Sequence, residues 1–310
     1  LFLGEVHLVG VPGVGPRLGD DRRVAVTPQD GSTRAFDDST FHHGSPCPTL
    51  TGPYWPEIGE SLLRLHLTGP VALVGPDQTI DEGQLPGAQG RVLLAALGME
   101  RSPIPSDVLA ERVWPIDRPD DWAKSLAPIV SKVRAQLRAA DPSGAANIRV
   151  GSGCHELVLP SDVWVDVEDA TRRLDRAEGA LRRGDARAAW TDAAPASAVL
   201  RRPFLPGFDA PWTDRWRLVL RDRRHRVWVV LAEAWLATGD ATLARAAAVS
   251  AVDADPYREE GHRLVIRSEL AAGNRPGAVH AAAACRQLLR QELGVDPSPE
   301  TEALEREALG

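Results

Sequence analysis

The sequence predicts a mainly helical protein with a small β component: one compact mixed domain followed by a series of paired helices. Two patterns carry this prediction. Residues 62–160 combine short alternating apolar runs with three helix-like segments, and from Asp166 the chain is helix-rich with recurring Gly-Asp or Gly-Asn breaks. With 310 residues, of which 43% are hydrophobic and 25% charged, the chain is long enough for two or three ordinary globular cores.

The first 61 residues are rich in Gly, Pro, Asp, Ser and Thr and show no sustained apolar period. A segment of this composition buries little apolar surface, which predicts a largely disordered N-terminal extension over 1–61. Within it we expect short strands only at 5–9 and 23–27.

Residues 62–165 have the element order of a winged helix-turn-helix domain. Leucines from Leu63 to Leu67 alternate with Arg and His, which is the period of a half-buried strand. Ser106 is the expected N-cap of the second helix. In chain order the patterns predict strands at 63–67 and 71–74, helices at 88–97, 106–114 and 125–138, and a Gly-tipped hairpin at 147–160.

The third helix is predicted from one continuous apolar stripe. Its members recur at helical spacing: Leu126, Ile129, Val130, Val133 and Leu137. An interior proline would cost roughly 3 kcal/mol. If Ser125 is the N-cap, Pro128 falls in the first turn, where a missing N–H costs nothing. The sequence therefore predicts a helix over 125–138 that starts at Ser125.

The outward face of this helix is basic. The stretch 122–138 holds the only two lysines of the chain and no acid, although the formal net charge of the protein is −7. A solvated face is the simplest interpretation, but ordinary faces interleave acids at i±4. Uncompensated charge before a hairpin also suits phosphate contacts in a major groove. The candidate DNA-binding residues on and beside this face are Lys124, Ser125, Ser131, Lys132, Arg134 and Arg138.

The hairpin is the candidate wing, with Asn147, Arg149, Ser152 and His155 as its polar residues. Residues 62–165 as a whole hold ten Lys/Arg against twelve Asp/Glu, so DNA binding has to come from a local patch. Four neutralised phosphates would give a salt slope of about −3.6. Affinity of one copy should be modest, which favours two copies on repeated half-sites.

Residues 166–310 predict tetratricopeptide-like helical repeats. The breaks at Gly239-Asp240 and Gly273-Asn274 are 34 residues apart, and a third break stands at Gly184-Asp185. A 34-residue helix–turn–helix period with small residues at fixed offsets is typical of such repeats. An Ala-rich bundle without repeats is the alternative. The tryptophans at helical spacing are expected in the core of this region: Trp212, Trp216, Trp228 and Trp235.

Six stretches give the chain a family likeness: "LPGAQGRVLLAAL", "PSDVLAERVWP", "SLAPIVSKVRAQL", "IRVGSGCHELVLP", "LVIRSELAAGNRPGAVHAAAACRQLLRQELGVDPSPETEALEREAL" and, within the last, the most specific piece "RQELGVDPSPETEALE". Over roughly 62–310 the chain resembles the Streptomyces antibiotic regulatory protein family, whose DNA-binding fold is similar to that of response-regulator effectors and is followed by a bacterial transcriptional activation domain.

The resemblance implies an activator, working as a homodimer on direct repeats at the promoters of an antibiotic gene cluster and contacting the sigma or alpha subunit of RNA polymerase. It implies a recognition helix at 125–138, a polymerase-facing loop at 115–124 and a wing at 147–159. This chain departs from the family's Gly-Tyr-Arg-like wing sequence with Gly153-Cys154-His155. It also departs in the first repeat, where Pro195 is expected to break a helix.

No group of residues predicts catalysis, a metal site or a cofactor. The glycine-rich stretch at 10–20 lacks the Gly-Lys-Ser/Thr of a phosphate-binding loop. Three dispersed cysteines favour a reducing, cytoplasmic location, and no run of 18 apolar residues predicts a membrane span. The competing functional class is a helical-repeat adaptor whose winged helix makes only protein contacts.

Overall fold

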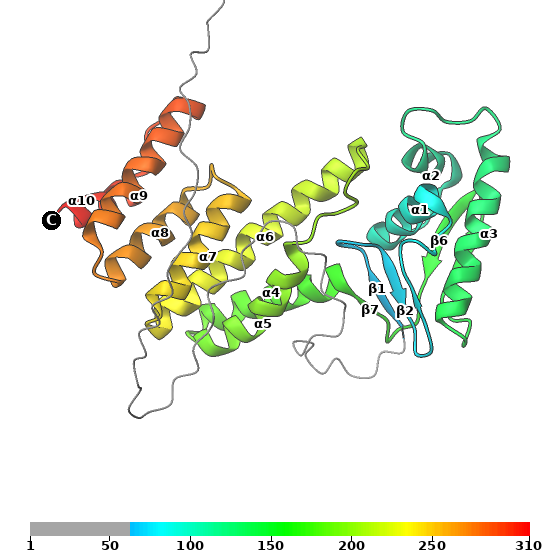
Figure 1. Ribbon diagram of the computed structural model, residues 1–310, viewed down its shortest axis with the longest axis horizontal. Coiled ribbons are helices and arrows are strands. Elements are labelled where there is room, and N and C mark those ends of the chain that lie inside the picture. Colours follow the sequence, from blue (N-terminus) through cyan, green and yellow to red (C-terminus); the bar gives the residue numbers. More distant parts are fainter. Residues whose placement is uncertain (1–62) are drawn as a thin grey trace, which may run out of the picture. The chain divides into compact units, whose positions relative to one another are not determined.

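In the computed structural model of the protein, residues 63–310 are described (Figure 1). The extension expected at 1–61 and its two predicted strands lie outside the described residues. The described part is mainly helical with a few short strands, which confirms the predicted fold class.

The first part contains two small sheets and three helices. One sheet has the strand order β3-β2-β1-β7 and the other β4-β6-β5. The elements are β1 (Arg64–His66), β2 (Ala72–Val74), β3 (Thr79–Ile80), α1 (Gly87–Glu100), β4 (Ile104–Pro105), α2 (Ser106–Val113), α3 (Trp122–Ala140), β5 (Asn147–Gly151), β6 (Cys154–Val158) and β7 (Trp164–Val165).

Helix α1 forms the centre of this part. Residues on every side of it are buried, among them Val92, Leu93, Leu94 and Leu97. A helix that is apolar all round is one that other elements enclose. A Cβ at Gly98 would lie 2.9 Å from the side chain of Leu67, so α1 packs closely against the end of β1 because Gly98 has no side chain.

Three strands and one cap differ from the sequence prediction. β3, β4 and β7 were not expected, because strands of two residues have no readable period. Ser106 is not the N-cap of α2; Pro105 is, and the Ser106 hydroxyl donates to the Gly153 carbonyl at 2.7 Å. The serine is used for a contact between α2 and the hairpin rather than for a local cap.

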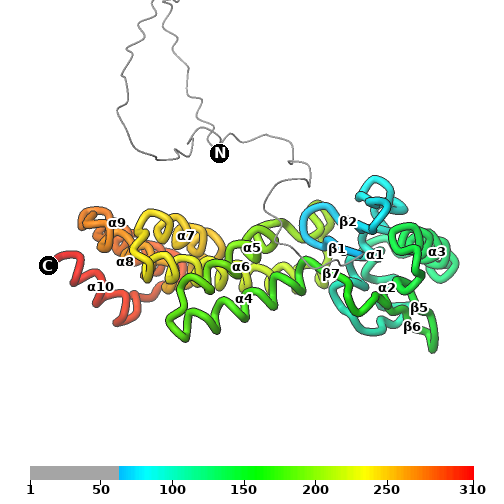
Figure 2. Tube along the Cα trace, turned by 90° about the horizontal axis from the view of Figure 1, so that it is seen from below, coloured from blue at the N-terminus to red at the C-terminus, as the bar shows by residue number. Residues whose placement is uncertain are grey.

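From Asp166 the chain forms antiparallel helices in which each packs against the next (Figure 2). They are α4 (Asp166–Arg182), α5 (Ala186–Leu200), α6 (Pro211–Thr238), α7 (Ala241–Ala254), α8 (Glu259–Ala271), α9 (Arg275–Leu288), the π-helical turn η1 (Leu289–Leu293) and α10 (Pro299–Leu309). Pro195 lies inside α5 and does not break it, which corrects the prediction for the first repeat. The four tryptophans expected in this core pack against it while remaining partly exposed.

The three predicted breaks share one local structure. Gly184, Gly239 and Gly273 have φ angles of 79°, 83° and 73°, in the left-handed region that ends helices at glycine. The side chain of the next residue (Asp185, Asp240 or Asn274) then accepts a hydrogen bond from the backbone N–H three residues on. One dipeptide therefore ends one helix and caps the next.

Asp166 joins the first part to the helices. Its carboxylate is fully buried and accepts hydrogen bonds from Leu67 N and Thr68 N, both at 3.0 Å, and from Thr68 Oγ1 at 2.8 Å. Further along, the Gly69 N–H donates to the Pro203 carbonyl at 2.8 Å. Among the described residues no helix is long and apolar enough to span a membrane.

Candidate nucleic-acid interface

Helix α3 turns one face to the core and the other to solvent. Leu126, Val130, Val133 and Leu137 are at most 3% exposed, as the apolar stripe predicted. In Figure 1 the helix lies at the edge of the first part, and it packs against β5 of the hairpin. Because this stripe is buried, the polar residues of α3 lie mainly on the opposite face of the helix.

The helix begins earlier than predicted. Ser125 is not the N-cap, because α3 starts at Trp122 with Asp121 at the cap position, and the Ser125 N–H donates to the Asp121 carbonyl at 3.1 Å. Pro128 is therefore inside the helix, and the Lys124 carbonyl four residues before it lacks the usual amide partner. Both residues are exposed at this point of the helix.

The start of α3 also changes the charge pattern. Lys124 Nζ lies 2.9 Å from the carboxylate of Asp121, with both side chains highly exposed. The acid-free stretch 122–138 thus begins one residue after the carboxylate that pairs with its first lysine. An exposed pair of this kind contributes about 0–1 kcal/mol, so a phosphate could displace the carboxylate.

The middle and end of the outer face carry free cations. Ser131, Lys132 and Arg138 are exposed. Within 63–310, neither Lys132 nor Arg138 forms an ion pair with an acidic side chain. Ala127 and Ala135 are exposed on the same side, and their small side chains allow another molecule to approach the helix backbone.

Arg134 has a different position from its neighbours. Its Nε and Nη2 donate to the Ile148 carbonyl at 2.8 and 2.6 Å, and its side chain is half-buried. The prediction that Arg134 lies free on the outer face is corrected: its guanidinium holds β5 of the hairpin against α3. Arg134 therefore positions the hairpin beside α3.

The hairpin places two of its predicted residues in solvent. Ser152 is exposed at the tip with a φ of 52°, next to Gly153 at 74°. Arg149 is exposed on β5, but its Nε lies 3.0 Å from the Glu156 carboxylate across the hairpin. Asn147 accepts a hydrogen bond from the Ile148 N–H at the base. The wing therefore presents one partly neutralised cation and one hydroxyl.

His155 is not available to DNA in this packing, which corrects the prediction for it. The residue is only 7% exposed, and its Nδ1 lies 3.2 Å from Ser106 Oγ. Burial lowers the pKa of the His155 imidazole, and the nearby Arg134 guanidinium lowers it further. His155 lies on the same face of β6 as the buried Leu157, and α1 and α2 pack against this strand, while adjacent strand residues face the other way.

Two contacts that the sequence did not reveal fix the C-terminal end of α3. A Cβ at Gly75 would lie 1.9 Å from the Ala140 carbonyl oxygen, so only glycine allows the turn after β2 to pass this end. Asp141 accepts hydrogen bonds from Ser143 Oγ and Ala146 N, both at 2.6 Å. The Asp-Pro-Ser-Gly order after the helix indicates a turn, but the close approach of Gly75 has no sequence signature.

The connection between α2 and α3 exposes an aliphatic side chain. Ile116 is 87% exposed, the largest exposed fraction among the large hydrophobic residues of the described chain. Arg118 lies over the Trp122 ring at 5.9 Å and within 3.5 Å of Glu111. The connection ends at Asp121, earlier than the 115–124 expected, because α3 takes in the residues from Trp122 on. Ile116 is not among the residues predicted to be functional, although it stands in the sequence as an isolated aliphatic residue between Pro115 and Pro119.

Comparison with known proteins shows which family and which relatives the chain resembles. Residues 165–309 match the family described as the bacterial transcriptional activator domain. The regulatory protein AfsR of Streptomyces griseus is 26% identical over 251 residues, which are 80% of this chain and 24% of that protein. This chain thus spans about a quarter of the length of that relative.

Among solved structures, the chain is similar to Mycobacterium tuberculosis EmbR, solved in complex with a low affinity phosphopeptide. The TM-score is 0.71 at 23% identity, covering 80% of this chain and 65% of that one. At this identity the similarity shows a shared fold. Within residues 63–310, no three His, Cys, Asp or Glu side chains are grouped so that they could hold a metal ion.

Proposed function

Since the chain belongs to the Streptomyces antibiotic regulatory protein family of transcriptional activators, we propose that residues 62–165 bind promoter DNA and that 166–310 carry the activating function. In this proposal α3 enters the major groove, and the β5–β6 hairpin lies over the adjacent backbone. The target is a promoter of an antibiotic gene cluster, and two copies bind direct repeats.

The observation that supports DNA binding best is the outer face of α3. Lys132 and Arg138 are exposed cations without carboxylate partners in the described chain, on a helix whose other face is anchored in the core. Phosphate contacts position a protein on a duplex, and polar side chains of the same helix read the base edges. Ser131 is exposed next to Lys132 and two turns before Arg138, and it is the candidate for base contact. Lys124, Arg149 and Ser152 supply secondary contacts.

We further propose that the connection between α2 and α3, which exposes Ile116, makes a protein contact of its own, in addition to the activating function of 166–310. Ile116 is 87% exposed in a loop beside α3, where a protein bound to the same promoter would reach it. We assign that partner to the sigma or alpha subunit of RNA polymerase. Arg118 and Trp122 stiffen the C-terminal half of the connection, which would limit the ordering cost on binding.

The test is fluorescence anisotropy on duplexes from upstream of the neighbouring genes, over a series of salt concentrations. The variant is Lys132→Ala/Arg138→Ala, and the control is Arg182→Ala/Arg187→Ala, which removes the same charge from two exposed sites on α4 and α5. We expect the variant to bind roughly tenfold or more weakly and its salt slope to fall by about 1.8, at about 0.9 per lost phosphate contact.

The adaptor alternative predicts another result. If the Lys132→Ala/Arg138→Ala variant binds low-salt duplex as tightly as the unaltered protein, α3 does not lie against DNA, and the winged part serves protein contacts. Equal loss in the Arg182→Ala/Arg187→Ala control would indicate only a response to net charge.

A further inference from the structure

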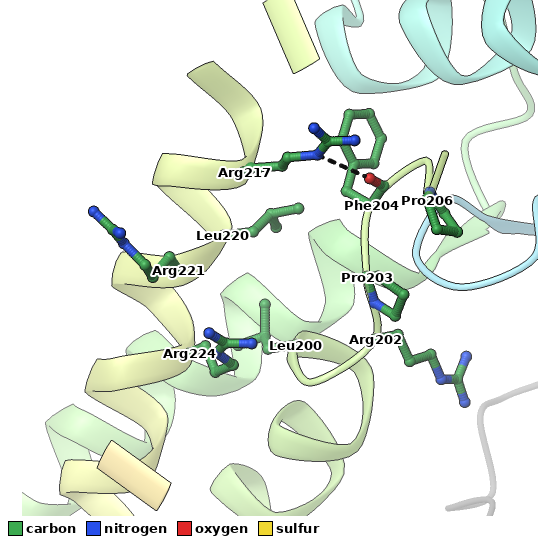
Figure 3. Close-up of a pocket in the computed structure, with 9 residues that line it drawn as sticks. All are labelled: Leu200, Arg202, Pro203, Phe204, Pro206, Arg217, Leu220, Arg221 and Arg224. Carbon is green, nitrogen blue, oxygen red and sulfur yellow. Dashed lines mark hydrogen bonds between the residues drawn. The ribbon is translucent and has the colours of Figure 1, made fainter. Parts of the chain in front are cut away.

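A pocket lies between the end of α5, the connection 201–210 and the first half of α6 (Figure 3). Its volume is about 360 Å³. This is within the range of about 300–1,000 Å³ that small-molecule sites occupy in proteins. The lining combines apolar side chains, chiefly Leu200, Phe204 and Leu220, with four arginines: Arg202, Arg217, Arg221 and Arg224.

One of the four arginines maintains the shape of the pocket. Arg217 donates to the carbonyls of Phe204, Leu205 and Phe208 at 3.3, 3.0 and 2.8 Å, and it pairs with Asp209 at 2.7 Å. Figure 3 shows its side chain reaching the connection beside Phe204. With its donors engaged, Arg217 fixes the connection and has little capacity left for a ligand.

The other three arginines form no comparable ion pairs within residues 63–310. Within 63–310, Arg202, Arg221 and Arg224 form no ion pair, whereas Arg217 and Arg226 on the same helix do. Arg224 Nε is buried, and no acceptor of the described chain receives its hydrogen. A buried unpaired donor costs about 1–3 kcal/mol, more when the group is charged, and guanidinium does not lose its proton.

Only Arg224 lies over the apolar wall. In Figure 3 it is beside Leu200, while the side chains of Arg221 and Arg202 point outward on opposite sides of the pocket. Arg202 and Arg224 are half-buried and Arg221 is exposed, so Arg221 can rotate over the opening. Guanidinium groups bind carboxylates and phosphates in bidentate geometry.

We propose that this pocket binds a small organic anion: its carboxylate or phosphate group contacts Arg224 and Arg221, and its apolar body packs against Leu200, Phe204 and Leu220. The charge of the ligand satisfies cations that the described part of the chain leaves unpaired, and the apolar wall sets the requirement for a hydrocarbon body. Inorganic phosphate would meet only half of this requirement.

The place of the pocket connects it to the winged part, beyond the DNA-binding role proposed for α3. Phe204 of the pocket wall forms a β-bridge with Thr68, and the Pro203 carbonyl accepts from Gly69 N. A ligand that binds only the folded connection stabilises it by mass action. Occupancy should therefore raise the melting temperature of the protein, which can be measured without DNA.

The test is calorimetric titration of the full chain with octyl phosphate and with octanoate, with octanol and inorganic phosphate as partial ligands. Arg221→Gln/Arg224→Gln is the variant, and Arg182→Gln/Arg187→Gln is the control of equal charge change outside the pocket. We expect saturable one-to-one binding of at least one amphiphilic anion, at least roughly tenfold weaker in the variant and within about twofold in the control. The tighter of the two anions identifies the head group.

Three results would overturn the proposal: no saturable binding of either anion, equal binding by the variant, or equal loss in the control. Octanol binding as tightly as octanoate would contradict the role of the arginines. If the double variant does not fold, the single variant Arg221→Gln, at the exposed opening, gives the same comparison with a smaller expected loss. Because no arm contains DNA, these outcomes are independent of whether α3 binds a promoter.

Discussion

The arginines of the helical repeats and the cations on the outer face of α3 differ in what they face. In the repeats, arginines pair with acids on neighbouring helices: Arg226 with Glu178 at 2.8 Å, Arg258 with Asp222 at 2.6 Å and Arg267 with Glu233 at 3.1 Å. On α3, Lys132 and Arg138 face no acid of the described chain. The arginines of the repeats are therefore engaged in pairs between helices, whereas the two cations on α3 are left without an acid in the described chain.

The spacing of one of these pairs matches the repeat period. Glu233 and Arg267 are 34 residues apart, the repeat period, so the pair links equivalent helices of successive units. Such exposed pairs each add little free energy, because solvent screens them. A cation left unpaired keeps its charge available for a polyanion. Substitutions in the two regions should thus separate stability from DNA affinity.

The largest effect is expected where the two regions meet, at Asp166. Asp166→Ala removes a fully buried acceptor and leaves the N–H groups of Leu67 and Thr68 without a partner. We expect the free energy of unfolding to fall by about 3–5 kcal/mol, measured by urea denaturation.

Asp162→Ala, at an exposed turn nearby, is the control and should change the unfolding free energy by less than about 0.5 kcal/mol. Asp166→Asn should be intermediate, because an amide retains one acceptor oxygen. Equal stability of the Ala variant and the unaltered protein would show that Asp166 does not hold β1 to the helices.

A smaller effect on the free energy of unfolding is expected at Arg134. This residue lies on α3, but, like the arginines of the repeats, its side chain is engaged within the protein. Arg134→Ala loses the two bonds to the Ile148 carbonyl and should destabilise the protein by about 1–3 kcal/mol. Because the guanidinium positions the hairpin, DNA affinity should fall less than in Lys132→Ala/Arg138→Ala, with little change in salt slope. A salt slope reduced by about 0.9 would instead make Arg134 a phosphate contact.

The repeats were the most predictable part of the fold from sequence, because their determinants are local. Each Gly-Asp or Gly-Asn break needs only two adjacent residues to end one helix and cap the next, so the pattern could be read directly. The stripe of α3 was predictable for the same reason. Strands of two residues and the start of α3 were not, because contacts with distant segments decide them. Pro195 also misled, since the surrounding helix accommodates it.

The candidate site was predictable only as far as a helical face. Periodicity placed Ser131, Lys132 and Arg138 outward, and the structure has them exposed. The same periodicity placed Arg134 outward, but the hairpin that covers it comes from residues 14 positions later. For His155, strand alternation alone could not tell which face of β6 packs against α1 and α2. Their roles in DNA binding remain predictions that the affinity measurements test.

A third variant isolates the structural use of arginine. Arg226→Ala removes a two-point contact with Glu178, with both nitrogens within 2.9 Å of the carboxylate. We expect a loss of about 0.5–1 kcal/mol in unfolding free energy and no change in DNA affinity. Lys132→Ala/Arg138→Ala should show the reverse. A loss of DNA affinity in Arg226→Ala would place α6 in the interface and remove the distinction between the two regions.

The smallest effect concerns pH and the buried imidazole of His155. Burial and Arg134 lower its pKa from the ordinary value of 6.5, so the folded chain binds this proton less readily than the unfolded chain does. Above about pH 6.5 both states are neutral at this position and no stability is lost. As the pH falls below that value the unfolded chain is protonated first, so stability declines until the folded pKa is reached. His66 adds a change of the same sign, because burial lowers its pKa as well.

His155→Gln should therefore flatten, without abolishing, the decline in urea midpoint between about pH 7.5 and 5.5. An unchanged decline would mean that His155 is solvated in the folded protein, which would return its ring to the set of side chains able to reach DNA.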